Sequence, residues 1–351
     1  MTPAPLTPPK PPFQESNLWS TPIRDLGLTI EGTRLEPVIQ TFLQELERVG
    51  IRRLRPRFYL SSEWGVPFET VSIAIPFYLS STELMAMHAD QMGLIEGFDP
   101  EDILRYLRHE MGHVVNYAYC LYDTEEWIKL FGSITQPYED EYTPEPFSRR
   151  HVRHLPGWYA QKHPDEDWSE TFAVWMTPEL DWRTEYSAWP VARAKLAYCD
   201  RIMRELGNRD PDVTDDELDE DVGEIDYSLA EFYDSTGNGF VDMPPGFDGA
   251  IRAIFDDLAR DAGGGRKGER PELLPAANLF TRLERDLMAS VYRWTGHFPE
   301  RTRQLVRHLA ERATKLEQGY PASRKQAAEV AVTTLVTALA MNHIHRGSYL
   351  P

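Results

Sequence analysis

The sequence of 351 residues contains few cysteines and no long apolar run. Its two cysteines, Cys120 and Cys199, are too few for a disulfide framework and are typical of a reducing compartment. No uninterrupted apolar stretch reaches the roughly 18 residues that mark a membrane-spanning helix, and the first residues carry no apolar segment of a secretion signal. We therefore expect a soluble, cytoplasmic protein that has no membrane partner.

Basic charge is also scarce. The chain has 37 Lys and Arg against 56 Asp and Glu, which gives a net charge of −19. Phosphate backbones and anionic lipids repel such a chain, so we expect no nucleic-acid partner. The hydrophobic content of 41% is enough, at this length, for one large domain or two ordinary ones with a real core.

The most informative stretch is His109–His113, which reads His-Glu-Met-Gly-His. Asp99 and Pro100 predict a helix start, and apolar residues keep helical spacing as far as Ala118. Two imidazoles four residues apart on a helix lie on one face and can bind the same zinc ion. Glu110 would then reach a water at the metal and not the metal itself. This motif predicts a zinc-dependent peptidase; the alternative is a surface helix with two unrelated histidines.

A catalytic zinc usually takes a third protein ligand. Asn116 and Tyr119 stand where the metzincin pattern requires Gly and His, which excludes that pattern. Downstream, Pro164 followed by acidic residues predicts a second helix, on which Glu166 and Glu170 are one turn apart. We predict that Glu166 is the third ligand. We also predict that Glu170 accepts a hydrogen bond from a ligand histidine, on the side of the ring away from the metal. The other downstream candidates for the third ligand are His151, His154, His163, Asp167 and Glu170 itself.

These segments resemble the gluzincins, in which His-Glu-x-x-His is followed by a helix with Glu-x-x-x-Asp or Glu-x-x-x-Glu. The pair Glu166 and Glu170 has this spacing. The resemblance implies that Glu166 binds zinc. Gluzincins of the lethal-factor type also carry a tyrosine seven residues before this ligand, and Tyr159 holds that position. The resemblance implies that Tyr159 supports the oxyanion while Glu110 acts as general base.

A closer resemblance, to a bacterial family of zinc-binding metallopeptidases, rests on Ile75–Tyr78, His109–His113 and His163–Trp168. It covers roughly residues 50–205. It implies an α+β, zincin-like domain with a small antiparallel or mixed sheet, one zinc ion, and a protein or peptide substrate. Residues 71–78 would form an edge strand that pairs with the substrate, or else a strand of an internal hairpin. Glu170 stands where thermolysin-like gluzincins carry Asp.

We expect four regions along the chain. Residues 1–17 form a proline-rich tail, 18–207 the metallopeptidase domain, 208–246 an acidic linker whose charges repel one another, and 247–351 a helical bundle. The last helix of the bundle is expected to be too short to span a membrane. The bundle is either a structural appendage or a docking module for a protein partner. Within the domain, the predicted elements are helices at 36–50, 165–177 and 190–206 and strands at 57–60 and 71–75.

Two other functions remain open from the residues alone. One is a catalytically silent scaffold or adaptor of the zincin fold that binds a protein partner through the helical bundle. Retention of Glu110 weighs against it, because a silent member has no need of the base. The other is a zinc hydrolase that acts on a non-peptide amide.

Overall fold

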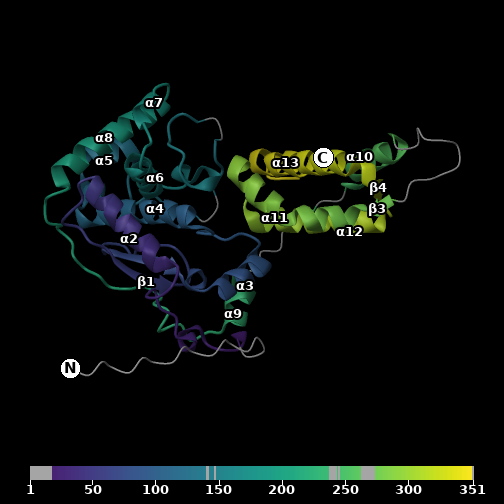
Figure 1. Ribbon diagram of the computed structural model, residues 1–351. Coiled ribbons are helices and arrows are strands. Elements are labelled where there is room, and N and C mark those ends of the chain that lie inside the picture. Colours follow the sequence, from purple (N-terminus) through teal and green to yellow (C-terminus); the bar gives the residue numbers. More distant parts are fainter. Residues whose placement is uncertain are drawn as a thin grey trace.

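The computed structural model describes residues 18–139, 142–145, 148–236, 243, 246–261 and 273–349. The expected tail at 1–17 lies outside the described residues. The protein is mostly helical, with 60% helix and two small two-stranded sheets. Its elements form two lobes (Figure 1), which we call the larger lobe (residues 18–236) and the helical lobe (residues 246–349).

The larger lobe contains the helices and strands that the sequence predicts, within two residues at each end, and several more. Helix α3 and helix α9 were not predicted. In chain order the elements are η1 (Ile23–Leu26), α2 (Leu35–Arg48), β1 (Arg57–Ser61), β2 (Ser72–Pro76), η2 (Phe77–Ser80), α3 (Thr82–Met92), α4 (Pro100–Ala118), η3 (Leu121–Asp123), α5 (Glu125–Phe131), η4 (Pro156–Gln161), α6 (Pro164–Met176), α7 (Trp182–Glu185), α8 (Pro190–Leu206) and α9 (Leu229–Thr236).

Strands β1 and β2 are parallel, with Arg57 opposite Ser72, so a hairpin at this place is excluded. On the other side of β2, the N–H of Ala74 donates to the carbonyl of Gly65 over 2.8 Å in an antiparallel bridge. With this bridge included, the strand pairing around β2 is partly parallel and partly antiparallel. The prediction that β2 itself offers a free edge is wrong at Ala74, because the chain around Gly65 already covers it.

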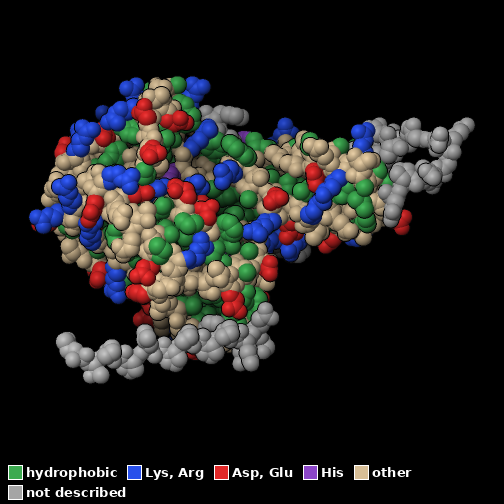
Figure 2. All heavy atoms as spheres, in the orientation of Figure 1, with side chains coloured by type: hydrophobic (Ala, Val, Ile, Leu, Met, Phe, Trp, Pro, Cys, Tyr) green, Lys and Arg blue, Asp and Glu red, His purple; other side chains and the backbone are tan. Residues whose placement is uncertain are grey.

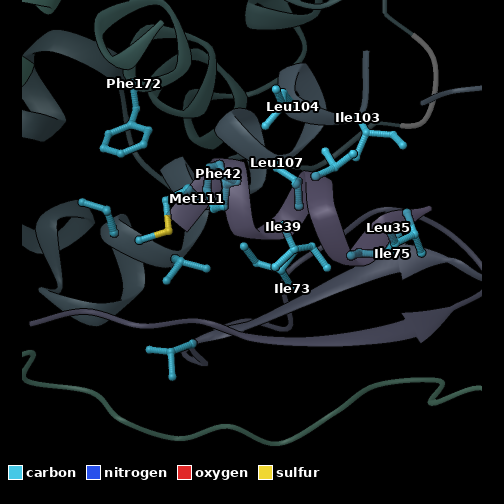
Figure 3. Close-up of a cluster of buried hydrophobic side chains, with 14 of the residues drawn as sticks. Leu35, Ile39, Phe42, Ile73, Ile75, Ile103, Leu104, Leu107, Met111 and Phe172 are labelled. Carbon is cyan, nitrogen blue, oxygen red and sulfur yellow. The ribbon is translucent and has the colours of Figure 1, made fainter. Parts of the chain in front are cut away.

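One apolar cluster joins α2, β2, α4 and α6 (Figure 3). Helix α4 is buried at every residue from Tyr106 to Ala118, so both its core face and its opposite face are covered. Arg108 of α4 also makes two hydrogen bonds of 2.8 Å to the buried carboxylate of Glu45 on α2. These contacts hold α4 in a fixed place in the middle of the lobe. On the face shown in Figure 2, acidic and basic side chains are interspersed over the outside of this lobe.

The acidic stretch that was expected to be a linker packs on the larger lobe over residues 208–236. The N–H of Val71 donates to Asp215 O over 2.7 Å, and the N–H of Val222 to Leu60 O over 2.8 Å. Ile225 and Leu229, the first residue of α9, are buried in the core. The prediction of a linker at 208–246 is wrong for this part, because its few apolar residues turn inward while its charges face water.

The helical lobe is a bundle of four helices around its own apolar core, as the sequence predicts. A short antiparallel contact between β3 and β4 joins the ends of its helices. The elements are α10 (Asp248–Asp261), β3 (Leu273–Pro275), α11 (Ala276–Thr295), α12 (Pro299–Lys315), β4 (Gly319–Pro321), η6 (Ala322–Arg324) and α13 (Lys325–Arg346).

Helix α13 corrects one expectation. By length and composition alone, the segment Ala322–Arg346 is sufficient to cross a membrane, so the prediction that this helix is too short is wrong. A single helix of this kind is weak evidence for a membrane span, since helices of protein cores pass the same test. Val332, Val336 and Leu339 of α13 lie in the core of the bundle.

Candidate metal centre

Helices α4 and α6 cross where α4 carries Gly112. A Cβ atom at Gly112 would lie 2.6 Å from the Cα atom of Ser169 on α6. The indole N–H of Trp168 donates to the Gly112 carbonyl over 2.7 Å and ties the two helices together at the same point. The glycine inside the His-Glu-x-x-His motif therefore allows the close approach that brings the side chains of both helices into one site.

Three side-chain atoms of these helices converge on one buried point. His109 Nε2 lies 2.9 Å and His113 Nε2 3.4 Å from Glu166 Oε2, and the two nitrogens are 3.2 Å apart. Ligands at about 2.0–2.1 Å from a tetrahedral metal ion are separated by about 3.3–3.4 Å. In the described part of the chain, this is the one group of histidine, cysteine and acidic residues whose ligand atoms lie close enough together to hold a metal ion.

The outer nitrogens of both imidazoles face carboxylates. His109 Nδ1 lies 2.9 Å from Glu170 Oε1, and His113 Nδ1 lies 3.0 Å from Asp165 Oδ2. An ionised carboxylate can only accept hydrogen bonds, so each Nδ1 donates, and a neutral ring then presents a lone pair at Nε2. Two lone pairs thus face Glu166 Oε2, a buried oxygen without a well-aligned hydrogen-bond donor. Three acceptors pointed at one another require a cation, which is the property of a metal site.

The two outer carboxylates are themselves held in place. Glu170 Oε2 accepts the backbone N–H groups of His154 and Leu155 over 3.1 and 2.9 Å. Asp165 Oδ1 accepts the side-chain amide of Asn116 over 2.7 Å. Partners of this kind fix the orientation and the tautomer of a ligand histidine. The structure thus brings Glu170 to the place that the sequence analysis gave it, and adds Asp165.

The site favours positive charge without any ion. Burial alone would lower the pKa of His109, but its contacts with Glu166 and Glu170 raise it to about 9. Burial likewise opposes protonation of His113, yet Asp165 and Glu166 raise its pKa well above the ordinary value. Burial would raise the pKa of the Glu166 carboxyl, and the charge of His113 and the contact with His109 hold it well below its usual range. In a metal-free protein, protons would occupy the place that a metal cation fits.

The centre opens into a cleft of about 460 Å³, which Glu110 and Tyr159 also line. Burial raises the pKa of the Glu110 carboxyl, while the two imidazoles act to lower it. Tyr159 lies in η4 with its ring centroid 5.5 Å from that of His109. Just before it, Gly157 and Trp158 have φ of 79° and 64°, left-handed values that turn the chain sharply before Tyr159.

Two residues at the centre were missed by the sequence analysis. Asp165 precedes Glu166 directly in the first turn of α6, and the adjacent acid was a signal that could have found it. The hydroxyl of Tyr138 donates to Glu166 Oε1 over 2.5 Å and lies 3.4 Å from the hydroxyl of Tyr159. Tyr138 is 28 positions before Glu166 in a loop, and no local pattern marks it.

The other candidate histidines bond elsewhere. His154 Nε2 lies 2.9 Å from the carbonyl oxygen of Arg105, and burial lowers the pKa of His154 to about 4. His151 Nε2 is 3.9 Å from Asp167, and burial and Lys195 lower its pKa to about 4. His163 Nε2 lies 3.1 Å from the carbonyl oxygen of Gln136, and Asp167 pairs with Lys195. None of these alternatives belongs to the converging group, and Glu170 faces the outer nitrogen of His109 instead of the centre.

Comparison with protein-family models, with curated proteins and with solved structures finds no match to this chain.

Proposed function

We propose that this protein is a zinc-dependent metallopeptidase of the gluzincin type, with a zincin-like arrangement in its larger lobe. The observation that supports this most is the convergence of His109 Nε2, His113 Nε2 and Glu166 Oε2 within 2.9–3.4 Å of one another, at the wall of an open cleft. His109, His113 and Glu166 would hold one zinc ion. Imidazole nitrogens and a carboxylate oxygen are a donor set that zinc accepts.

Zinc bound at such a site lowers the pKa of water toward about 7 and polarises a carbonyl group. Glu110 accepts the proton of the attacking water and passes it to the amide nitrogen as the C–N bond breaks, so that OH is added to carbon and H to nitrogen. The hydroxyl of Tyr159 donates a hydrogen bond to the carbonyl oxygen as negative charge develops on it. Tyr138 holds the free oxygen of Glu166 by the hydrogen bond described above and so orients this ligand.

A catalytic role is favoured over a structural one by the number of ligands. Structural zinc sites are closed by four protein ligands, whereas catalytic sites have three and an open position. In the described part of the chain the group has three members, and a cleft lies in front of it. This composition argues against an adaptor in which the metal only supports the fold.

The substrate is proposed to be a protein or peptide in extended form. Residues 63–66 line the cleft, and Gly65 is bridged to β2 through Ala74. A segment that continues a sheet at its edge can pair with an extended peptide through backbone hydrogen bonds. We therefore assign the pairing role to 63–66 and not to β2.

The test compares the wild type with Glu110→Gln, using metal analysis and a peptide-library digest. We expect one zinc per chain in both proteins, and a loss of turnover of about 100- to 10,000-fold in Glu110→Gln, because the base is gone and the ligands are intact. Glu83→Gln, an exposed change at the start of α3, is the matched control and should hydrolyse like wild type. Unchanged turnover in Glu110→Gln would remove Glu110 from the mechanism, and a wild type that binds no zinc would refute the proposal.

A further inference from the structure

A second cavity adjoins the cleft at the metal centre and shares lining residues with it. The first cavity contains His109, His113 and Glu166, and the second, of about 500 Å³, extends toward the helical lobe. The residues that line both are Glu63, Glu96, Tyr159 and Tyr292. We call the second cavity the groove. Because Tyr159 stands beside His109 and also lines the groove, a chain bound at the metal centre can run on into it.

The helical lobe provides one wall of the groove. Tyr292 of α11, Phe298 in the turn after α11, and Glu300 at the start of α12 all line it. The ring of Tyr292 packs on Gly157: a Cβ atom there would come within 2.5 Å of the ring, and Gly157 has a left-handed φ of 79°. Tyr292 also stacks with Phe298 at 6.2 Å between centroids. The helical lobe is therefore fitted to the 3-10 helix that carries Tyr159, and it is more than an appendage.

Glu96, which is half-buried, lines both cavities together with Tyr292. The negative charge of Glu96 acts on the hydroxyls of Tyr78, Tyr106 and Tyr292. Burial raises the pKa of the Glu96 carboxyl, a hydrogen bond from Tyr106 lowers it, and the charges of Glu300, Asp102 and Glu110 raise it, so that the pKa comes to about 7. Glu96 thus lies in an environment that stabilises its ionised form poorly.

Acidic residues line the two cavities, without lysine or arginine among the described lining residues. Besides the metal-site residues, the acids that line the two cavities are Glu63, Glu96, Glu220 and Glu300. Lys162 has its ammonium 4.2 Å from the ring of Tyr138 and lines neither cavity. Arg303, whose charge acts on His88 and which Glu300 affects in turn, also lines neither cavity.

We infer that the groove binds a lysine or arginine side chain of the substrate peptide, with Glu96 as its carboxylate partner and Tyr292 as part of its aromatic wall. A carboxylate that is partly withdrawn from water is stabilised by a paired cation, and an ammonium or guanidinium group is attracted to the faces of tyrosine rings. This inference rests on the proposed peptidase function, and it makes the enzyme selective for a basic residue close to the scissile bond.

The test measures binding apart from turnover. Zinc-loaded Glu110→Gln is titrated into labelled ten-residue peptides of a neutral host sequence, with lysine placed in turn at each position. The same peptides with acetyl-lysine, which has the same backbone and no charge, are the comparison. At one or two positions we expect lysine to bind at least about tenfold more tightly than acetyl-lysine, the size typical of a charge-assisted contact.

Variants in the Glu110→Gln background locate the effect. Glu96→Gln keeps the shape of the side chain and should reduce the lysine preference to less than about threefold. Glu300→Gln, in the same groove, should reduce the lysine preference in part. This variant replaces Glu96→Gln in the test if Glu96→Gln does not fold. Glu329→Gln, an exposed carboxylate of α13 that pairs with Arg282, is the matched control and should leave the preference unchanged.

The outcomes separate the two proposals. Equal binding of lysine and acetyl-lysine peptides, absence of binding, or a preference that survives both groove variants would overturn the inference. If the wild type hydrolyses peptides without regard to basic residues, the inference is refuted and the peptidase function is supported. If no peptide is hydrolysed by wild type but the lysine preference depends on Glu96, binding of a basic side chain in the groove is supported and the peptidase function is refuted.

Discussion

His109 of the larger lobe and His297 of the helical lobe are both buried, but their partners differ. His109 lies between the carboxylates of Glu166 and Glu170, which raise its pKa to about 9. His297 lies 2.8 Å from the hydroxyls of Thr302 and of Tyr349, and burial lowers its pKa to about 3. A histidine that only supports a fold is satisfied by neutral partners. Buried carboxylates around a histidine need a cation, which supports the proposal that the functional site lies in the larger lobe.

The same contrast holds for the helices as a whole. The first two turns of α6 bury Asp165, Glu166 and Glu170 against α4, and Asp167 against Lys195 of α8. In the other lobe, no acid is buried among the residues whose burial is described, and the buried polar side chains are the uncharged Thr295, His297 and Thr302. Burying four acids is costly unless each is paired, and a domain built for stability alone avoids it. Substitutions in the two lobes should therefore have unequal effects.

We expect the largest difference in the free energy of unfolding between a substitution at a buried ion pair and one at an exposed ion pair. Glu45→Ala leaves Arg108 buried beneath α2 with its main partner missing, and we expect a loss of about 3–5 kcal/mol in the free energy of unfolding. Glu329→Ala removes the exposed partner of Arg282 in the helical lobe and should change it by about 0–1 kcal/mol. Urea denaturation of both variants beside wild type measures this, and equal losses would contradict the contrast.

Alanine at two helical glycines should act in opposite directions. Gly112→Ala drives a methyl group into the backbone of Ser169, so we expect a loss of about 1–3 kcal/mol and weaker metal binding as α6 moves away from α4. At Gly249 in α10 nothing lies within 4 Å of an added Cβ, and Gly249→Ala should be neutral or stabilise by up to about 1 kcal/mol. Melting temperatures and chelator competition test both, and a harmless Gly112→Ala would show that the helix contact is less tight than described.

Glu170, which faces the outer nitrogen of His109, should affect metal affinity more than the stability of the fold. Glu170→Gln weakens the acceptor of the His109 Nδ1–H while keeping the side chain's shape, and we expect zinc affinity to fall about 10- to 100-fold. Glu205→Gln, at an exposed pair with Arg201 on α8, is the control and should bind zinc like wild type. Competition with a chromogenic chelator gives both dissociation constants. Identical values would remove Glu170 from the metal site.

The two histidines should also respond to pH with opposite signs in metal-free protein. The pKa of His297 is depressed from 6.5 to about 3, so its contribution to stability is present above pH 6.5 and is lost as the pH falls toward 3. The pKa of His109 is raised to about 9, so its contribution is present below pH 6.5 and is lost as the pH rises through 9. NMR titration of labelled histidine rings should find His109 charged and His297 neutral at pH 7.5. Titration of both near 6.5 would contradict the contrast.

The sequence predicts what depends on neighbours along the chain. Asp99 and Pro100 start α4, and Asp99 accepts the N–H of Asp102 as an N-cap should. Helical spacing then places His109 and His113 on one face, and Pro164 starts the helix of Glu166. These rules act over one or two turns, so a single sequence is enough to apply them.

What the sequence does not predict depends on contacts between distant segments. Tyr138 reaches Glu166 from a loop, and Tyr292 reaches the cleft from the other lobe, where no spacing rule connects them to the motif. The charge run after residue 208 indicated a linker, although Ile225 and Leu229 within it are buried in the core. Charge patterning reports the exposed side of such a segment and not the side that packs.

The most direct test of the central claim is X-ray absorption spectroscopy of the zinc-loaded protein beside Glu166→Ala. The account predicts one zinc per chain with two imidazole nitrogens and oxygen ligands, all at about 2.0–2.1 Å and without sulfur, and a loss of tight zinc binding in Glu166→Ala. Failure of the wild type to bind zinc, a spectrum with four protein ligands, or unchanged zinc binding in Glu166→Ala would contradict it.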